Sequence, residues 1–149
     1  MRDAMMRIVR LLAGVCLASA IATPSVFGES FNEVVKKVEG RIEPTVAKRG
    51  QTVSWKVTVD VNPPWHTYPT RQSADPDSAY INKFEFPKSD QVVFVGELQE
   101  PNNVHPEMVK NVGIVDMIKD SGTWERPFIV KPDAIPGKYE LKGRVKILV

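Results

Sequence analysis

The stretch QTVSWKVTVDV, residues 51–61, alternates strictly between apolar and polar side chains. In an extended chain, one face of this stretch carries only large apolar residues: Val53, Trp55, Val57, Val59 and Val61. The opposite face carries hydroxyl and charged groups. A period of two with many β-branched residues predicts a half-buried antiparallel strand. Gly50, directly before it, can adopt a positive φ and predicts a turn.

Further short strands are predicted on both sides of this one. VEGRIEPTV (38–46) alternates more weakly, and Pro44 confines it to a sheet edge. SFNEVVKKV (30–38) fits either a short helical turn or a lead-in to that edge strand. Five later stretches are predicted as strands: YINKFEFP (80–87), QVVFVGEL (91–98), GIVDMI (113–118), WERPFIVK (124–131) and KYELKGRVKILV (138–149).

The segments between these strands carry turn signals. EPNNVHPEMVKNVG (100–113) is predicted to be a long polar loop, and KDSGT (119–123) and PDAIPG (132–137) are predicted turns. Six or seven short strands with almost no helix predict a single antiparallel β-sandwich, with jelly-roll or barrel closure as alternatives. A length of 149 residues fits one domain.

Residues 1–28 have the layout of a secretory signal peptide. Three arginines precede an apolar run, LLAGVCLASAIA (11–22), and small residues follow it. Cleavage after Ala20, Ala22 or Gly28 fits this layout. An uncleaved anchor or a buried first helix are the alternatives, although the apolar run is short for a membrane span.

Removal of residues 1–28 would leave a mature chain without cysteine, because Cys16 is the single cysteine. Val15 before it disfavours a lipoprotein signal. Three of the 20 basic residues and one of the 18 acidic residues fall in this segment, so 17 of each sign remain. The remaining charges are interspersed, which argues against nucleic acid or an anionic membrane surface as the main partner.

Metal binding rests on the two histidines, His66 and His105, with Met108 and Met117 near the second. Imidazole and thioether ligands suit copper in an exported β-sandwich. These residues lack tight ligand spacing, however, and only the fold could bring them together. We therefore expect no metal and no other cofactor.

Other catalytic patterns are weak. No serine lies in a nucleophile-elbow context, and the chain has neither a glycine-rich phosphate loop nor a zinc motif. Asp75 and Asp77 lie in SADPDS (73–78), which has the composition of a solvated turn.

The aromatic loop NPPWHTYPT (62–70) directly follows the first strand described above. His66 and Tyr68 are two positions apart and point to the same side of an extended chain, so they could form one wall of a shallow site. The alternative is that Trp65, His66 and Tyr68 close the end of the sandwich core.

The motif PPWHTY (63–68) after a strand resembles the amino-terminal periplasmic domain of the thiol:disulfide interchange protein DsbD family. The family motif usually reads Pro-Gly-Trp-His-x-Tyr, and Pro64 stands where the glycine is common. PGKYELKGRVKILV (136–149) is similar to the family strand that leads into the first redox cysteine. The resemblance covers roughly residues 33–149.

The resemblance implies that residues 29–149 form an immunoglobulin-like β-sandwich in the periplasm. It implies a cysteine pair that takes electrons from a membrane-embedded donor domain. The pair passes them to periplasmic thiol oxidoreductases, a pathway linked to cytochrome c biogenesis. In the family the pair follows a strand like the last one here, so the first cysteine is expected after Val149. No catalytic residue is therefore predicted within the chain, and whether it acts as an enzyme stays open.

The resemblance also implies that Trp65, His66 and Tyr68 line the redox site, where an imidazole or phenol can tune the thiolate fraction. By its order along the chain, EPNNVHPEMVKN (100–111) would take the place of the family loop that caps the cysteines, but it lacks an aromatic residue. Two other functions stay open: a β-sandwich module for protein interaction without redox chemistry, and an exported copper-binding sandwich.

Overall fold

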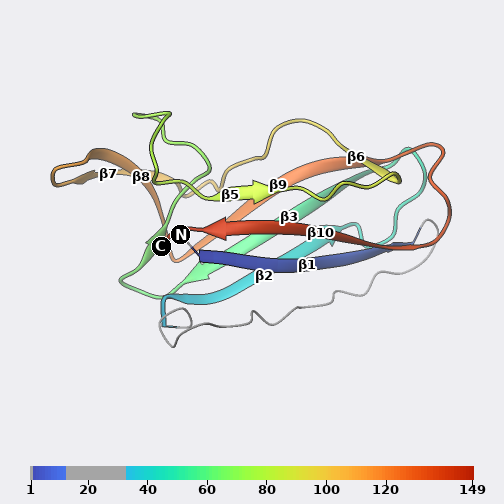
Figure 1. Cartoon of the computed structure of the whole chain (residues 1–149), viewed down its shortest axis with the longest axis horizontal. Coiled ribbons are helices and arrows are strands. Elements are labelled where there is room, and N and C mark those ends of the chain that lie inside the picture. The colour runs from blue at the N-terminus through green and yellow to red at the C-terminus, as the bar shows by residue number, and fades with distance from the viewer. Residues whose placement is uncertain (1, 13–32) are drawn as a thin grey trace.

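The computed structural model describes residues 2–12 and 33–149, and β-strands make up its regular structure apart from a helical assignment at residues 33–34 (Figure 1). The strands are β1 (Arg2–Leu12), β2 (Val35–Glu43), β3 (Thr52–Val61), β4 (His66–Thr67), β5 (Lys83–Glu85), β6 (Val92–Phe94), β7 (His105–Val109), β8 (Gly113–Lys119), β9 (Ser121–Val130) and β10 (Lys138–Ile147). All their pairings are antiparallel. The predicted all-β class with antiparallel sheets is therefore confirmed.

The strands form three sheets, in the orders β2-β3-β9-β6, β1-β10-β5 and β4-β8-β7. The first two sheets face each other across the main hydrophobic core, to which both contribute buried side chains. The third, smaller sheet includes the β7–β8 hairpin, which projects from the end toward which β10 runs (Figure 1). Over residues 2–12 and 33–149, no helix has the length and apolar character needed to cross a membrane.

β3 has the predicted alternation in full. Its apolar residues from Val53 to Val61 are all buried, and the intervening residues are partly or fully exposed. β3 pairs with β2 on one side and with β9 on the other, so its ladder hydrogen bonds are satisfied along both edges. Complete burial of one face fixes the register, because a slip by one residue would expose every apolar side chain.

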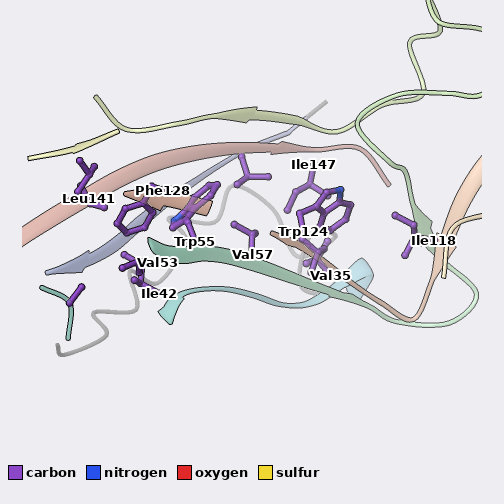
Figure 2. Close-up of a cluster of buried hydrophobic side chains, with 14 of the residues drawn as sticks. Val35, Ile42, Val53, Trp55, Val57, Ile118, Trp124, Phe128, Leu141 and Ile147 are labelled. Atoms are coloured by element: carbon purple, nitrogen blue, oxygen red, sulfur yellow. The ribbon is translucent and has the colours of Figure 1, made fainter. Parts of the chain in front are cut away.

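Trp55 of β3 lies at the centre of the core, fully buried. Its ring makes edge-on contacts with Phe84, Phe86 and Phe94, at centroid distances of 6.4, 5.2 and 6.3 Å. Phe84 also contacts Trp124, with the ring centroids 5.4 Å apart, and so joins the two indoles. Figure 2 shows the two indoles at different points along the core. These offset and edge-on geometries are the favoured ones for aromatic pairs.

One predicted sheet edge is confirmed, and one predicted loop contains a strand. β2 ends at Glu43, directly before Pro44, and is an edge strand as predicted. The predicted loop at residues 100–113 is wrong over His105–Val109, which form β7. Pro106 lies within β7, where it is tolerated because β7 is itself an edge strand and one of its backbone sides carries no ladder.

The predicted turn at residues 119–123 is also shorter than expected. β8 ends at Lys119 and β9 begins at Ser121, so the connection between these strands of two different sheets is confined to Asp120, which has a positive φ of 65°. Aspartate is one of the few residues besides glycine that adopt this conformation readily.

The N-terminal residues 2–12 form β1, which pairs with β10. The predicted cleavage positions Ala20, Ala22 and Gly28, and Cys16, lie outside the described residues. The signal peptide therefore stays a prediction.

Gly143 in β10 generates a testable prediction for the core. A Cβ atom at this position would lie 2.9 Å from Trp55 Cζ2 and 3.2 Å from the carbonyl oxygen of Glu85. We expect Gly143→Ala to lower the free energy of unfolding by about 1–3 kcal/mol, because the backbone and the buried indole must both move. Urea unfolding followed by tryptophan fluorescence measures this. The neighbouring exposed change Lys142→Ala should stay within about 0.5 kcal/mol, and equal effects of the two changes would contradict the prediction.

Candidate functional site

The aromatic loop that follows β3 is partly a strand. His66 and Thr67 form β4, which pairs with the end of β8: His66 lies opposite Lys119, and Thr67 lies opposite Ile118. This pairing fixes the direction of the side chains on both sides of β4. His66 and Tyr68 therefore lie on one face, and Thr67 lies on the other.

His66 and Tyr68 are joined by a hydrogen bond. His66 Nε2 and the Tyr68 hydroxyl oxygen are 2.9 Å apart, and the two rings meet edge-on at a centroid distance of 5.2 Å. Tyr68 is buried, with 7% of its surface exposed. The predicted wall formed by His66 and Tyr68 is thus present as a geometric feature. Trp65 is 46% exposed and does not close the end of the core.

Tyr68 packs in a small apolar cluster separate from the main core. The buried members of this cluster are Tyr68, Val115 and Met117, and Val109 and Leu148 pack against it. Burial raises the pKa of the Tyr68 phenol, and nearby Tyr80 raises it further. The hydroxyl group is therefore a neutral hydrogen-bonding group throughout the neutral pH range.

Asn82 connects this loop to the end of β10. Its amide nitrogen donates to the carbonyl oxygen of Tyr68 at 2.6 Å, and its amide oxygen accepts from the backbone N–H of Leu148 at 2.8 Å. The Thr67 hydroxyl donates to the carbonyl oxygen of Leu148, also at 2.8 Å. Asn82 is only 1% exposed. The end of β10 is therefore held beside the His66–Tyr68 pair by side chains whose polar groups are satisfied.

A second polar group fixes the segment that follows the aromatic loop. Gln72 accepts from the backbone N–H of Asp116 at 2.6 Å and donates to the carbonyl oxygen of Tyr80 at 2.7 Å. The Asp116 carboxylate accepts from the backbone N–H of Ser73 at 2.8 Å and from its hydroxyl group. Residues 72–80 are thus held against β8, which keeps Tyr80 within 5.5 Å of the Tyr68 ring.

Glu100 holds the other end of the aromatic loop to β9. One of its carboxylate oxygens accepts from the backbone N–H of Thr70 at 2.9 Å and from the Thr70 hydroxyl group. The other accepts from the Trp124 indole N–H at 2.7 Å. The loop is therefore anchored to the core through a charged acceptor, and such bonds are stronger than those between neutral groups.

Asn82, Gln72 and Glu100 were not predicted as site residues. Each is polar and lies in a stretch of turn or strand composition, and their bonding partners are up to 66 residues away in sequence. No local pattern could have identified them, although an asparagine between apolar residues in YINKFEFP is a weak signal.

The residues proposed for copper do not converge. His105 lies opposite Met117 across β7 and β8, whereas His66 lies opposite Lys119 on the far side of β8. Both ring nitrogens of His105 have partners: Nδ1 lies 3.1 Å from the carbonyl oxygen of Asn103, and Nε2 lies 3.3 Å from a Glu107 carboxylate oxygen. Across the described ranges, no group of three or more His, Cys, Asp and Glu residues could hold a metal.

The β7–β8 hairpin exposes apolar side chains at the same end of the molecule. Met108 is 75% exposed, and Val112 and Ile114 are about half exposed. The reversal between the strands uses positive φ angles at Asn111 and Gly113. Met108 and Ile114 lie opposite each other on the face of the hairpin that points away from Tyr68. An exposed apolar face of this kind has the character of a contact surface for another protein.

A polar hollow of about 450 Å³ lies elsewhere, along β9. It is lined by Gln99, Glu100, Pro101, Asn102, Asn103, Ser121, Thr123 and Glu125. Several of its polar groups already bond within the protein: Asn103 donates to the carbonyl oxygen of Ser121 at 2.8 Å, and the Thr123 hydroxyl bonds that of Thr58 at 2.9 Å. The hollow therefore offers few free groups to a ligand.

Comparisons with known proteins identify no relative of this chain. No protein-family model matches the chain, and no curated protein or solved structure is significantly similar to it.

The role of Asn82 gives a prediction for the site. Asn82→Ala leaves the buried carbonyl oxygen of Tyr68 and the N–H of Leu148 without these partners, so we expect stability to fall by about 1–3 kcal/mol. Hydrogen exchange of the Leu148 amide should accelerate by about tenfold or more, which corresponds to roughly 1.4 kcal/mol. Asn102→Ala, an exposed loop change, is the control. An unchanged Leu148 amide in Asn82→Ala would show that Asn82 does not hold β10.

The environment of Tyr68 predicts an alkaline titration. The chain has three tyrosines, and we expect one phenol to ionise above the ordinary tyrosine value of about 10, because burial raises the pKa of Tyr68. The stability contributed by the neutral phenol is complete below pH 10 and is lost as pH rises through the higher folded-state pKa. Absorbance at 295 nm should show a late step that Tyr68→Phe removes. A late step that persists in Tyr68→Phe would assign it to another tyrosine.

Proposed function

We propose that this chain is an exported thiol:disulfide interchange domain of the DsbD type. Residues 1–28 would direct export to the periplasm, and residues 29–149 would form the immunoglobulin-like sandwich. The domain would receive reducing equivalents from a membrane-embedded donor and deliver them to periplasmic thiol oxidoreductases. The facing antiparallel sheets and the His66–Tyr68 pair support this proposal.

A single observation carries the proposal. The backbone of Leu148 is bonded to Thr67 and Asn82, and the Leu148 side chain packs against the cluster that contains Tyr68. Residues that follow Val149 would therefore begin close to Tyr68, the partner of His66. This is where the resemblance to the DsbD family requires the first redox cysteine.

The two aromatic residues suit thiol chemistry. In thiol–disulfide exchange a thiolate attacks a disulfide sulfur, and the rate depends on the thiolate fraction. A hydrogen-bond donor near the sulfur stabilises the thiolate and lowers the thiol pKa. The pair of His66 and Tyr68 keeps one such donor: their mutual hydrogen bond of 2.9 Å uses one hydrogen and leaves either the Tyr68 O–H or the His66 Nδ1–H, depending on the histidine tautomer.

The exposed hairpin supports the proposed partners. Met108 and Ile114 expose an apolar surface on the face of the hairpin opposite to the face that packs against Tyr68, and Val112 is exposed in the turn between the strands. A partner oxidoreductase must bring its own disulfide close to the sulfurs, and an apolar rim favours such transient docking. Methionine adapts its shape readily, which suits a surface that meets more than one partner.

The same hairpin favours a second candidate function, a β-sandwich interaction module without redox chemistry. The residues encoded after Val149 discriminate between the two functions. A cysteine within a few positions, followed shortly by a second cysteine, is expected for the interchange domain, and their absence favours the module. The 149-residue chain itself should not reduce insulin, since Cys16 is its only cysteine.

A thiol placed at Leu148 tests the chemistry of the pair directly. In Leu148→Cys the new thiol lies against the Tyr68 cluster, and we expect His66→Ala in this background to raise the thiol pKa by about half a unit to one unit. The rate of alkylation by iodoacetamide as a function of pH measures this pKa.

The matched control is Lys138→Cys, which places a thiol at the opposite, exposed end of β10. Its pKa should not respond to His66→Ala. If the two thiols respond alike, or if neither responds, then His66 does not tune a thiol at this site and the redox proposal loses its chemical basis.

A further inference from the structure

The β7–β8 hairpin carries two methionines on opposite faces. Met108 in β7 lies opposite Ile114, and Met117 in β8 lies opposite His105. Residues directly opposite each other in an antiparallel pair share a face, and neighbours along a strand alternate between faces. The two thioethers therefore point to different sides of one small element. Met108 is 75% exposed, whereas Met117 is only 5% exposed.

The packing of the two methionines differs in the same way. Met117 is one of the buried members of the cluster that contains Tyr68, and Met108 belongs to neither of the two apolar clusters of residues 33–149. The residue opposite Met108, Ile114, is itself 51% exposed. A chemical change at Met108 would therefore alter the surface of the hairpin and leave the packing of the core as it is.

A methionine thioether reacts with a peroxide by the transfer of one oxygen atom. A lone pair of the sulfur attacks one peroxide oxygen, and the O–O bond breaks. The attacked oxygen stays on the sulfur as a sulfoxide, and the other leaves as water after it takes up the proton that the first one loses. The sulfur is oxidised by two electrons, and the peroxide is reduced by the same two. The reaction needs only access to the sulfur, which exposure gives to Met108 and burial denies to Met117.

We propose that Met108 is an oxidation site at which peroxide converts the exposed face of the hairpin from apolar to polar while the fold stays intact. The sulfoxide oxygen is polar and accepts hydrogen bonds, and it would stand opposite Ile114 on this face. Apolar contacts made through the face would be weakened by the change, because Met108 is its most exposed apolar side chain. The hairpin thus responds to oxidants through its surface and not through unfolding.

The test treats the full chain with hydrogen peroxide and follows each methionine by mass spectrometry of tryptic peptides. Cleavage after lysine and arginine places Met108 and Met117 on separate peptides, residues 89–110 and 111–119. Met5 and Met6 fall on a third, residues 3–7. In the folded chain we expect Met108 to gain its oxygen at least about tenfold faster than Met117. In guanidinium the two rates should agree within about twofold, since neither sulfur is then protected.

Two variants link the modification to the surface of the hairpin. Met108→Leu keeps an apolar side chain that peroxide does not oxidise, and Met108→Gln places a polar amide at the same position. Peroxide should shorten the retention of the original chain on a hydrophobic-interaction column. Met108→Leu should lose most of this shift, and any remainder belongs to the other methionines. Untreated Met108→Gln should elute early, like the oxidised chain, and the fluorescence of the buried tryptophans should stay the same throughout.

Three results would overturn the proposal. They are equal oxidation rates of Met108 and Met117 in the folded chain, a loss of the folded-state tryptophan fluorescence when Met108 is oxidised, and the same retention shift in Met108→Leu as in the original chain. None of these readouts involves thiol exchange or export. Failure of the proposed function shows separately, in the thiol pKa of Leu148→Cys.

Discussion

The structure depends on the contact between Trp55 and the backbone of β10. Gly143 has no side chain, and a Cβ at that position would come within 2.9 Å of the indole. The strand therefore lies directly on the ring. Burial of a tryptophan removes about 150–250 Å² from water, worth roughly 4–6 kcal/mol at 25 cal/mol per Å². Among the described residues Trp55 Nε1 has no hydrogen-bond partner, and an unpaired buried N–H costs about 1–3 kcal/mol. The free energy gained by burying the indole is therefore larger than the cost of its unpaired N–H.

This contact determines where the candidate site forms. Gly143 is held against Trp55, and five residues later Leu148 is held by Thr67 and Asn82. Five residues of strand span roughly 17 Å. β10 thus links the centre of the core to the small sheet through a rigid element, and the His66–Tyr68 pair is positioned against a strand end whose location the core fixes. Sites supported in this way keep their geometry better than sites built on loops alone.

The sequence predicts the features that depend on local period and misses those that depend on distant pairing. β3 is predictable because its burial alternates residue by residue, and the shared side of His66 and Tyr68 follows from their spacing of two. β7 is not predictable, because Pro106 and the neighbouring asparagines suggest a loop, and only its position at a sheet edge makes the proline acceptable. Asn82 is missed for a similar reason: its role depends on Leu148, 66 residues later.

The two faces of β10 are under different constraints, because its inner side chains are buried in the core and its outer side chains are exposed to solvent. On the inner face Leu141, Val145 and Ile147 are fixed by close packing, where a change of one methylene group is felt. On the outer face the charges are solvated, and exposed ion pairs contribute little to stability. Folding does not require a particular charge at these positions. The buried residues of β10 therefore carry its share of the stability of the fold, and its exposed charged residues can change with little effect on that stability.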